Sequence, residues 1–152
     1  MDAPAYAIRP FRPADQSAAR DLILAGLAER WGALDPSLNR DLDDIWRHYV
    51  AGGGAFLVVE RAGEIVGTGG LSVEAPGVSR IERVSVARAH RRRGLARAIS
   101  QALVAEARRR GDTAVVVETT ASWRSAVALY RACGFTPEGE RDGDLHMRLA
   151  LD

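Results

Sequence analysis

A run of arginines that ends in a glycine has the clearest chemical potential in this sequence. It follows an alternating, strand-like stretch at residues 81–86 and precedes a helical pattern over residues 95–110. The first backbone N–H groups of a helix have no partner within the helix and carry the positive end of its dipole, so they can hold a phosphate. Glycine lets the backbone approach the anion, and arginine keeps its charge. The pattern predicts an anion site, with a solvated basic loop as the alternative. The run consists of Arg91, Arg92, Arg93, Gly94, Leu95 and Ala96.

A second segment, residues 126–135, has helical spacing and ends at Gly134 and Phe135. It comes after a continuous apolar run at residues 115–117, which is typical of a strand buried on both faces. The order of elements between residues 81 and 135 is therefore strand, helix, strand and helix.

With these two segments the chain resembles the GCN5-related N-acetyltransferase (GNAT) superfamily. The resemblance covers about residues 5–150, and residues 80–136 carry most of its specificity. The acetyl-CoA motif of that family, Gln/Arg-x-x-Gly-x-Gly/Ala, is matched by Arg91, Gly94 and Ala96. Its second motif, Ala-x-x-Leu-Tyr-x-x-x-Gly-Phe, is matched by Ala126, Leu129, Tyr130, Gly134 and Phe135. Many relatives have Asn three residues before the motif alanine, and this chain departs from them with Trp123.

The resemblance implies an α/β (mixed α+β) fold, a central mixed sheet of about seven strands with helices on both faces. It also implies one acetyltransferase domain over residues 1–152. In that family two neighbouring parallel strands splay apart, and the pantetheine arm lies in the gap. Here these strands would be residues 81–86 and 114–119. The cofactor contacts that the resemblance implies are Val84, Ser85, Val86, Arg91, Arg92, Arg93, Gly94, Leu95, Ala96, Arg97, Trp123 and Ala126.

The implied reaction moves an acetyl group from acetyl-CoA to a primary amine. It expels a CoA thiolate, and the resemblance makes Tyr130 the general acid that protonates it. Glu82 is the candidate base, because strand alternation would place it on the same sheet face as Val84 and Val86. Glu118 on the neighbouring strand is the alternative base, and water is a third.

The acceptor would be a small-molecule or peptide amine. In that family it docks between the first two helices and the last hairpin. Those regions carry an acidic rim that would suit a cation, and its members are Glu29, Asp35, Asp41, Asp142 and Asp144. A homodimer is a further expectation from the family. The competing hypothesis is an acyl-CoA sensor domain without turnover.

Composition excludes several other classes of function. All 21 basic residues are arginine, so the chain lacks the lysine of a P-loop or of a Schiff-base enzyme. A single cysteine, Cys133, excludes an internal disulfide, and no His or Cys stands at metal-ligand spacing, so no metal is expected. The net charge of +1 argues against nucleic acid as a partner. The absence of a long apolar stretch or signal region predicts a cytoplasmic protein without a membrane partner.

The remaining periodicity predicts the elements around the motifs. A helix starts near Asp15, an irregular stretch covers residues 26–39, and a second helix runs over residues 39–50 with Trp46 on its apolar stripe. Hairpins are expected at residues 55–73 and 136–149, the latter turning at Asp142-Gly143, with a loop at residues 75–79.

Overall fold

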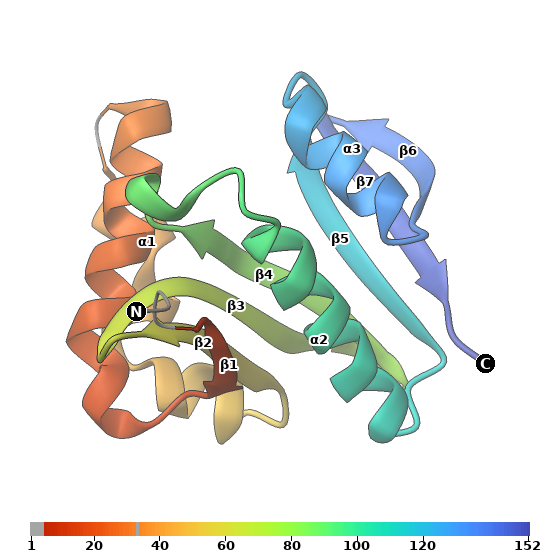
Figure 1. Cartoon of the computed structure of the whole chain (residues 1–152). Coiled ribbons are helices and arrows are strands. Elements are labelled where there is room, and N and C mark those ends of the chain that lie inside the picture. The colour runs from red at the N-terminus through yellow and green to blue at the C-terminus, as the bar shows by residue number, and fades with distance from the viewer. Residues whose placement is uncertain (1–4, 33) are drawn as a thin grey trace.

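A seven-stranded sheet forms the centre of the protein, as the computed structural model of residues 5–32 and 34–152 describes it (Figure 1). The strand order is β1-β2-β3-β4-β5-β7-β6, and every neighbouring pair is antiparallel except β4 and β5, which are parallel. The expected mixed sheet is confirmed. The strands are β1 (Ala7–Pro10), β2 (Ala55–Arg61), β3 (Glu64–Ala75), β4 (Val78–Val86), β5 (Ala114–Thr120), β6 (Thr136–Arg141) and β7 (Asp144–Ala150).

Two apolar clusters cover the two faces of this sheet. Along β2, Phe56 and Val58 pack into one cluster, whereas Leu57 and Val59 pack into the other. The first face is covered by α1 (Gln16–Trp31) and two short turns, η3 (Arg40–Asp43) and η4 (Trp46–Val50). The second face is covered by α2 (Leu95–Arg109) and α3 (Arg124–Ala132). In the part of the chain that the structure describes, no helix is long and apolar enough to cross a membrane.

The parallel strands β4 and β5 separate halfway along their length. They pair from Val78 opposite Ala114 to Ile81 opposite Val117, and no further. Figure 1 shows β4 and β5 diverging toward one end, with α2 in front of β4. The expected splay is therefore confirmed. Beyond Ile81 the edge of β4 that faces β5 has backbone groups without a strand partner, and these are free to bind something else.

A β-bulge at Arg83 interrupts the alternation of β4. Thr68 pairs with Ser85 and Gly70 pairs with Glu82, so two residues of β4 oppose one residue of β3. Arg83 has a φ of 57°, and its carbonyl accepts a 2.8 Å hydrogen bond from the buried Thr68 hydroxyl. The extra residue shifts every later side chain to the other face.

The expectation that Glu82 shares the face of Val84 and Val86 is consequently wrong. Both valines pack on the α2 side, whereas the Glu82 carboxylate meets Tyr49, which is buried on the α1 side. The one sign of the bulge in the sequence is spacing, because Ile81 and Val84 are three residues apart and yet pack on the same side, whereas Val84 and Val86 are two apart.

Three expected boundaries also differ. The helix α1 continues through Gly26 to Trp31, because a glycine at position 26 lets the helix lie close to Ser85 of β4. The loop expected at residues 75–79 is a tight turn, since β3 runs to Ala75 and β4 starts at Val78.

The predicted helix over residues 39–50 is broken into η3 and η4. Asp44 adopts extended dihedral angles between the two turns. The side chain of Gln16 compensates for the break: it donates to the Leu42 carbonyl at 2.7 Å and accepts from the Ile45 amide at 3.0 Å. These contacts come from α1, so the local sequence could not reveal them. Trp46, expected on the apolar stripe, is 42% exposed.

Gly69 allows α2 to pack directly on β3, and replacing it should destabilise the fold. A Cβ at this position would lie 2.4 Å from the Ile99 side chain and 3.0 Å from that of Leu103. We expect Gly69→Ala to lower the free energy of unfolding by roughly 1–3 kcal/mol, the usual effect of overpacking. Urea denaturation measures this. Gly139→Ala on β6 is the matched control, since its Cβ meets nothing within 4 Å. Equal effects of the two substitutions would contradict the packing argument.

Candidate active site

A cavity of about 770 Å³ opens where β4 and β5 separate. It is lined by the second half of β4, the start of α2, the last turns of α1 and the start of α3. Part of the loop of residues 91–94, called the arginine loop below, lines it as well. Both expected catalytic residues, Tyr130 and Glu82, line it, and so does Glu118. Every expected cofactor residue except Arg93 lines it as well: Val84, Ser85, Val86, Arg91, Arg92, Gly94, Leu95, Ala96, Arg97, Trp123 and Ala126.

The arginine loop has the geometry of an anion site. Gly94 is the residue that caps α2, with a φ of 76°, and a Cβ built on it would point into open space. The amides of Leu95, Ala96 and Arg97 follow in the first turn of α2, where they have no intrahelical acceptor. A phosphate could therefore reach several N–H groups and the dipole at once.

The three arginines of this loop and Arg97 of α2 differ in their surroundings. The Arg91 side chain donates to the Val86 carbonyl at 3.1 Å and to the Glu29 carboxylate of α1 at 2.8 Å. Arg92 and Arg97 are exposed beside the cavity, and Arg93 is exposed but does not line it. Three of the four arginines are thus placed to meet an anion in the cavity.

Tyr130 lies almost fully buried at the floor of this cavity. Its ring packs edge-on against Phe135, with ring centroids 5.7 Å apart. Burial, with a smaller contribution from nearby Cys133, raises the pKa of Tyr130 to about 12. The phenol is therefore protonated at neutral pH and can donate a proton. Cys133 itself is half-buried, and burial raises the pKa of its thiol.

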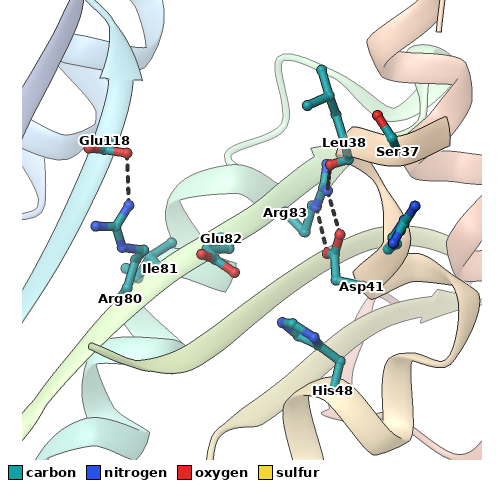
Figure 2. A pocket seen from close by; sticks show the side chains of 10 residues that line it. Ser37, Leu38, Asp41, His48, Arg80, Ile81, Glu82, Arg83 and Glu118 are labelled. Atoms are coloured by element: carbon teal, nitrogen blue, oxygen red, sulfur yellow. Dashed lines mark hydrogen bonds and ion pairs between the residues drawn. The ribbon is translucent and has the colours of Figure 1, made fainter. Parts of the chain in front are cut away.

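A second cavity, of about 520 Å³, lies on the α1 side of the same opening. Four residues line both cavities, so the two meet through the gap between the strands: Ile81, Glu82, Arg83 and Glu118. Figure 2 shows Glu82 lying between two arginine–carboxylate pairs, Arg80 with Glu118 and Arg83 with Asp41. Among the described residues that line the second cavity, Glu82 is the one carboxylate without an arginine partner.

The pair of Arg83 and Asp41 fixes one wall of the second cavity. Arg83 donates through Nε at 2.9 Å and Nη2 at 2.7 Å to the two Asp41 oxygens. The buried Tyr49 hydroxyl donates to the same carboxylate at 2.7 Å and lies 3.1 Å from Glu82. Burial alone would raise the pKa of Asp41, but the hydrogen bonds from Arg83 and Tyr49 and the charge of Arg83 hold it below its ordinary value.

Glu118 is bound on both oxygens. Arg80 donates to one of them at 2.8 Å, and His146 Nε2 lies 3.0 Å from the other. Arg80 also holds Glu74 with two hydrogen bonds of 2.8 and 3.0 Å. Since Arg80 lies on β4 and Glu118 on β5, this pair ties the two strands together just where their backbone pairing ends.

Several residues of this wall were not expected from the sequence. Tyr49, Arg83 and His48 are not among the site residues that the sequence predicts. A buried tyrosine that needs a partner for its hydroxyl was the available signal. Three of the five residues of the expected acidic rim are already engaged: Asp41 is paired with Arg83, Glu29 with Arg91, and Asp35 accepts hydrogen bonds from Ser37. Within residues 5–32 and 34–152, no group of three or more His, Cys, Asp or Glu could hold a metal.

Replacing Asp41 should destabilise the protein in a pH-dependent way. Asp41→Asn leaves Arg83 half-paired, and we expect the free energy of unfolding at pH 7 to fall by roughly 1–3 kcal/mol, given that the pair is partly exposed. A depressed carboxyl pKa contributes stability above the ordinary value of 3.8 and loses it as the pH falls through the lower folded value. The stability gap to the wild type should therefore narrow below about pH 3.8.

Denaturation curves from pH 7 into the acid range measure this gap. The exposed neighbour Asp43 supplies the control, because Asp43→Asn should change stability little at any pH. A difference in the free energy of unfolding that stays constant with pH would show that the Asp41–Arg83 ion pair does not cause it.

Comparison with known proteins places this geometry in a family. A sequence model described as the acetyltransferase (GNAT) family matches residues 20–135, more than half of the chain. The Mus musculus protein named "Probable N-acetyltransferase family 8 member 5" is 39% identical over 108 residues, covering 68% of this chain and 48% of that protein. The chain thus spans about half the length of the curated relatives it matches.

Solved structures agree on the fold. An acetyltransferase of the GNAT family from Staphylococcus aureus superposes with a TM-score of 0.87 at 19% identity, over 97% of this chain and 100% of the other. YncA from Salmonella typhimurium, solved with its cofactor acetyl-CoA, superposes with a TM-score of 0.81 at 22% identity, over 97% and 95%. The chain belongs to the acetyltransferase (GNAT) family.

Proposed function

We propose that this protein transfers an acetyl group from acetyl-CoA to a primary amine by direct attack. One observation carries the proposal. A cavity with an anion-binding loop and a cavity with one unpaired carboxylate meet at the gap between β4 and β5. The first cavity suits an anionic cofactor, and the second suits an amine. Their junction is the place where a thioester and an amine could react.

The cofactor would enter on the α2 side. Its phosphates would bind the amides at the start of α2, with Arg91, Arg92 and Arg97 as partners. The pantetheine arm would lie in the gap, where the unpaired edge of β4 offers backbone groups near Val84 and Val86. Membership of the GNAT family and the acetyl-CoA held by YncA support this cofactor.

The reaction then needs two proton transfers. The amine nitrogen attacks the acetyl carbonyl, the C–S bond breaks, and the electron pair leaves on the CoA sulfur. Tyr130 protonates that thiolate, which its protonated state and its place at the floor of the cavity support. Glu82 accepts the proton that the amine loses, directly or through water.

The contacts of the two carboxylates favour Glu82 over Glu118 as the base. Both oxygens of Glu118 are engaged, by Arg80 and by His146. Glu82 has one hydrogen-bond contact in the described part of the chain, from the Tyr49 hydroxyl at 3.1 Å. A carboxylate paired with arginine is a weak base, so Glu118 is better suited to holding β4 and β5 together.

Calorimetric titration with acetyl-CoA, followed by a thiol-release assay over a panel of amines, tests the proposal. We expect binding and amine-dependent release of CoA. Binding without release for any amine would instead support a sensor of acyl-CoA. The acceptor, the cytoplasmic location, the single-domain assignment and the possible homodimer stay predictions.

Tyr130→Phe should slow turnover while leaving the cofactor bound. The substitution removes only the hydroxyl, so the ring still packs against Phe135. We expect kcat to fall by roughly 10²–10⁴, the usual contribution of a positioned proton donor. The affinity for acetyl-CoA, measured by calorimetry, serves as the control for folding. A loss below about threefold, with pre-steady-state data placing thiolate departure in the rate-limiting step, would remove Tyr130 from the mechanism.

Glu82→Gln should alter the pH dependence of the reaction. An amine with a pKa near 10.4 is almost wholly charged at neutral pH, so its deprotonation needs help. We expect kcat/KM to drop most at low pH and progressively less as the free amine becomes abundant. Glu118→Gln is the paired variant and should keep the wild-type profile. The reverse pattern would place the base on β5, and two unchanged profiles would indicate deprotonation by solvent before binding.

A further inference from the structure

The last turn of α1 spans the opening of the cofactor cavity and is held on both sides of it. On one side Glu29 accepts a 2.8 Å hydrogen bond from Arg91 of the arginine loop. On the other side the guanidinium of Arg30 lies 3.2 Å from the ring centroid of Trp123, at the start of α3. These contacts connect α1, which packs on β4, to the loop after β5, across the gap between the strands.

Trp31 adds a further contact to Trp123 from outside the cavity. Its ring centroid lies 5.5 Å from that of Trp123, with 35° between the ring planes. Arg30 and Trp123 line the cavity, whereas Trp31 does not and is 59% exposed. The Arg30 side chain is exposed apart from this contact, and partial burial together with the nearby charge of Arg91 lowers its pKa. Trp31 itself has one ring face against Trp123 while most of its side chain stays exposed.

We propose that Arg30, Trp31 and Trp123 form a roof that closes over the pantetheine arm and keeps water from the thioester. The proposal rests on the acetyl-transfer function argued above. The indole ring of Trp123 provides an apolar surface on which the Arg30 guanidinium stacks.

The roof must open for the cofactor to enter and close once it is bound. A phosphate that binds Arg91 would displace Glu29 from it, so the contact of Arg30 with Trp123 is the attachment that holds the roof closed over a bound cofactor. Without the roof, a water oxygen could attack the acetyl carbon. The C–S bond would then break to give acetate and the CoA thiol, with one proton of the water ending on sulfur and the other in solvent. The roof residues are therefore positioning residues that suppress hydrolysis and slow cofactor release.

Two measurements on purified full-length chain test the roof. The first is the dissociation rate of acetyl-CoA, followed by a chase with unlabelled cofactor, which needs no turnover. The second is the rate of thiol release without any amine, divided by the rate with the best amine. We expect Trp31→Ala and Trp123→Asn each to raise both quantities roughly tenfold, about the size of one lost cation–π or stacking contact.

Trp46→Ala is the matched control, because Trp46 is similarly exposed but lies outside both cavities. It should leave both quantities unchanged. The double variant Trp31→Ala/Trp123→Asn should be no worse than the worse single variant, since both remove one shared contact. Trp123→Phe should fall between wild type and Trp123→Asn, which keeps the test independent of misfolding.

The roof proposal is contradicted if acetyl-CoA dissociates from the Trp31→Ala variant at the wild-type rate, even where it dissociates faster from Trp123→Asn. Trp123 would then be a cofactor contact that does not depend on Trp31. Failure of the proposed function looks different. In that case no amine accelerates thiol release from the wild type, while the dissociation rates still report on the roof.

Discussion

The separation of β4 and β5 after Ile81 and Val117 is the constraint on which the rest of this structure depends. Parallel strands that stop pairing expose backbone groups that must be satisfied elsewhere. The protein limits the opening with a side-chain hydrogen bond from Arg80 to Glu118, at the end of the backbone pairing. It also covers the opening on both faces, with α2 and α3 on one and α1, η3 and η4 on the other. The sheet therefore has an opening between β4 and β5 whose two sides are held in place by these contacts.

The bulge at Arg83 gives the two sides of that gap different chemistry. It directs Val84 and Val86 toward α2, so the cofactor side has an apolar wall. It directs Glu82 and Arg83 toward η3 and η4. A non-glycine residue with positive φ costs about 1–2 kcal/mol. Here the Thr68 hydroxyl and the Asp41 carboxylate offset that cost, since each binds the bulged residue directly. The bulge and the charge pattern of the second cavity are thus one feature.

Sequence reasoning predicted the parts of this site that depend on contiguous motifs. The arginine loop follows from residues that are neighbours in the chain, whereas the splayed strands and the role of Tyr130 were expected from the family that the motifs resemble. Nearly all of the expected residues line the cavity. It failed where a distant residue decides the local conformation. The Gln16 side chain binds backbone groups of Leu42 and Ile45 at the break between η3 and η4, and the Thr68 hydroxyl binds the carbonyl of the bulged residue. Neither contact can be read from the sequence of the segment that it stabilises. Face assignments made by alternation are reliable only in strands without such a bulge.

The exclusive use of arginine has structural consequences at this site. Arg83 binds Asp41 with two parallel hydrogen bonds, and Arg80 binds two carboxylates at once. The guanidinium of Arg30 lies 3.2 Å from the centroid of the Trp123 ring. Each arrangement requires a planar cation with several fixed donors, which an ammonium group cannot reproduce. Lysine in any of these three places would keep the charge but lose the geometry. The composition, whatever its origin, has therefore become part of how the two cavities are built.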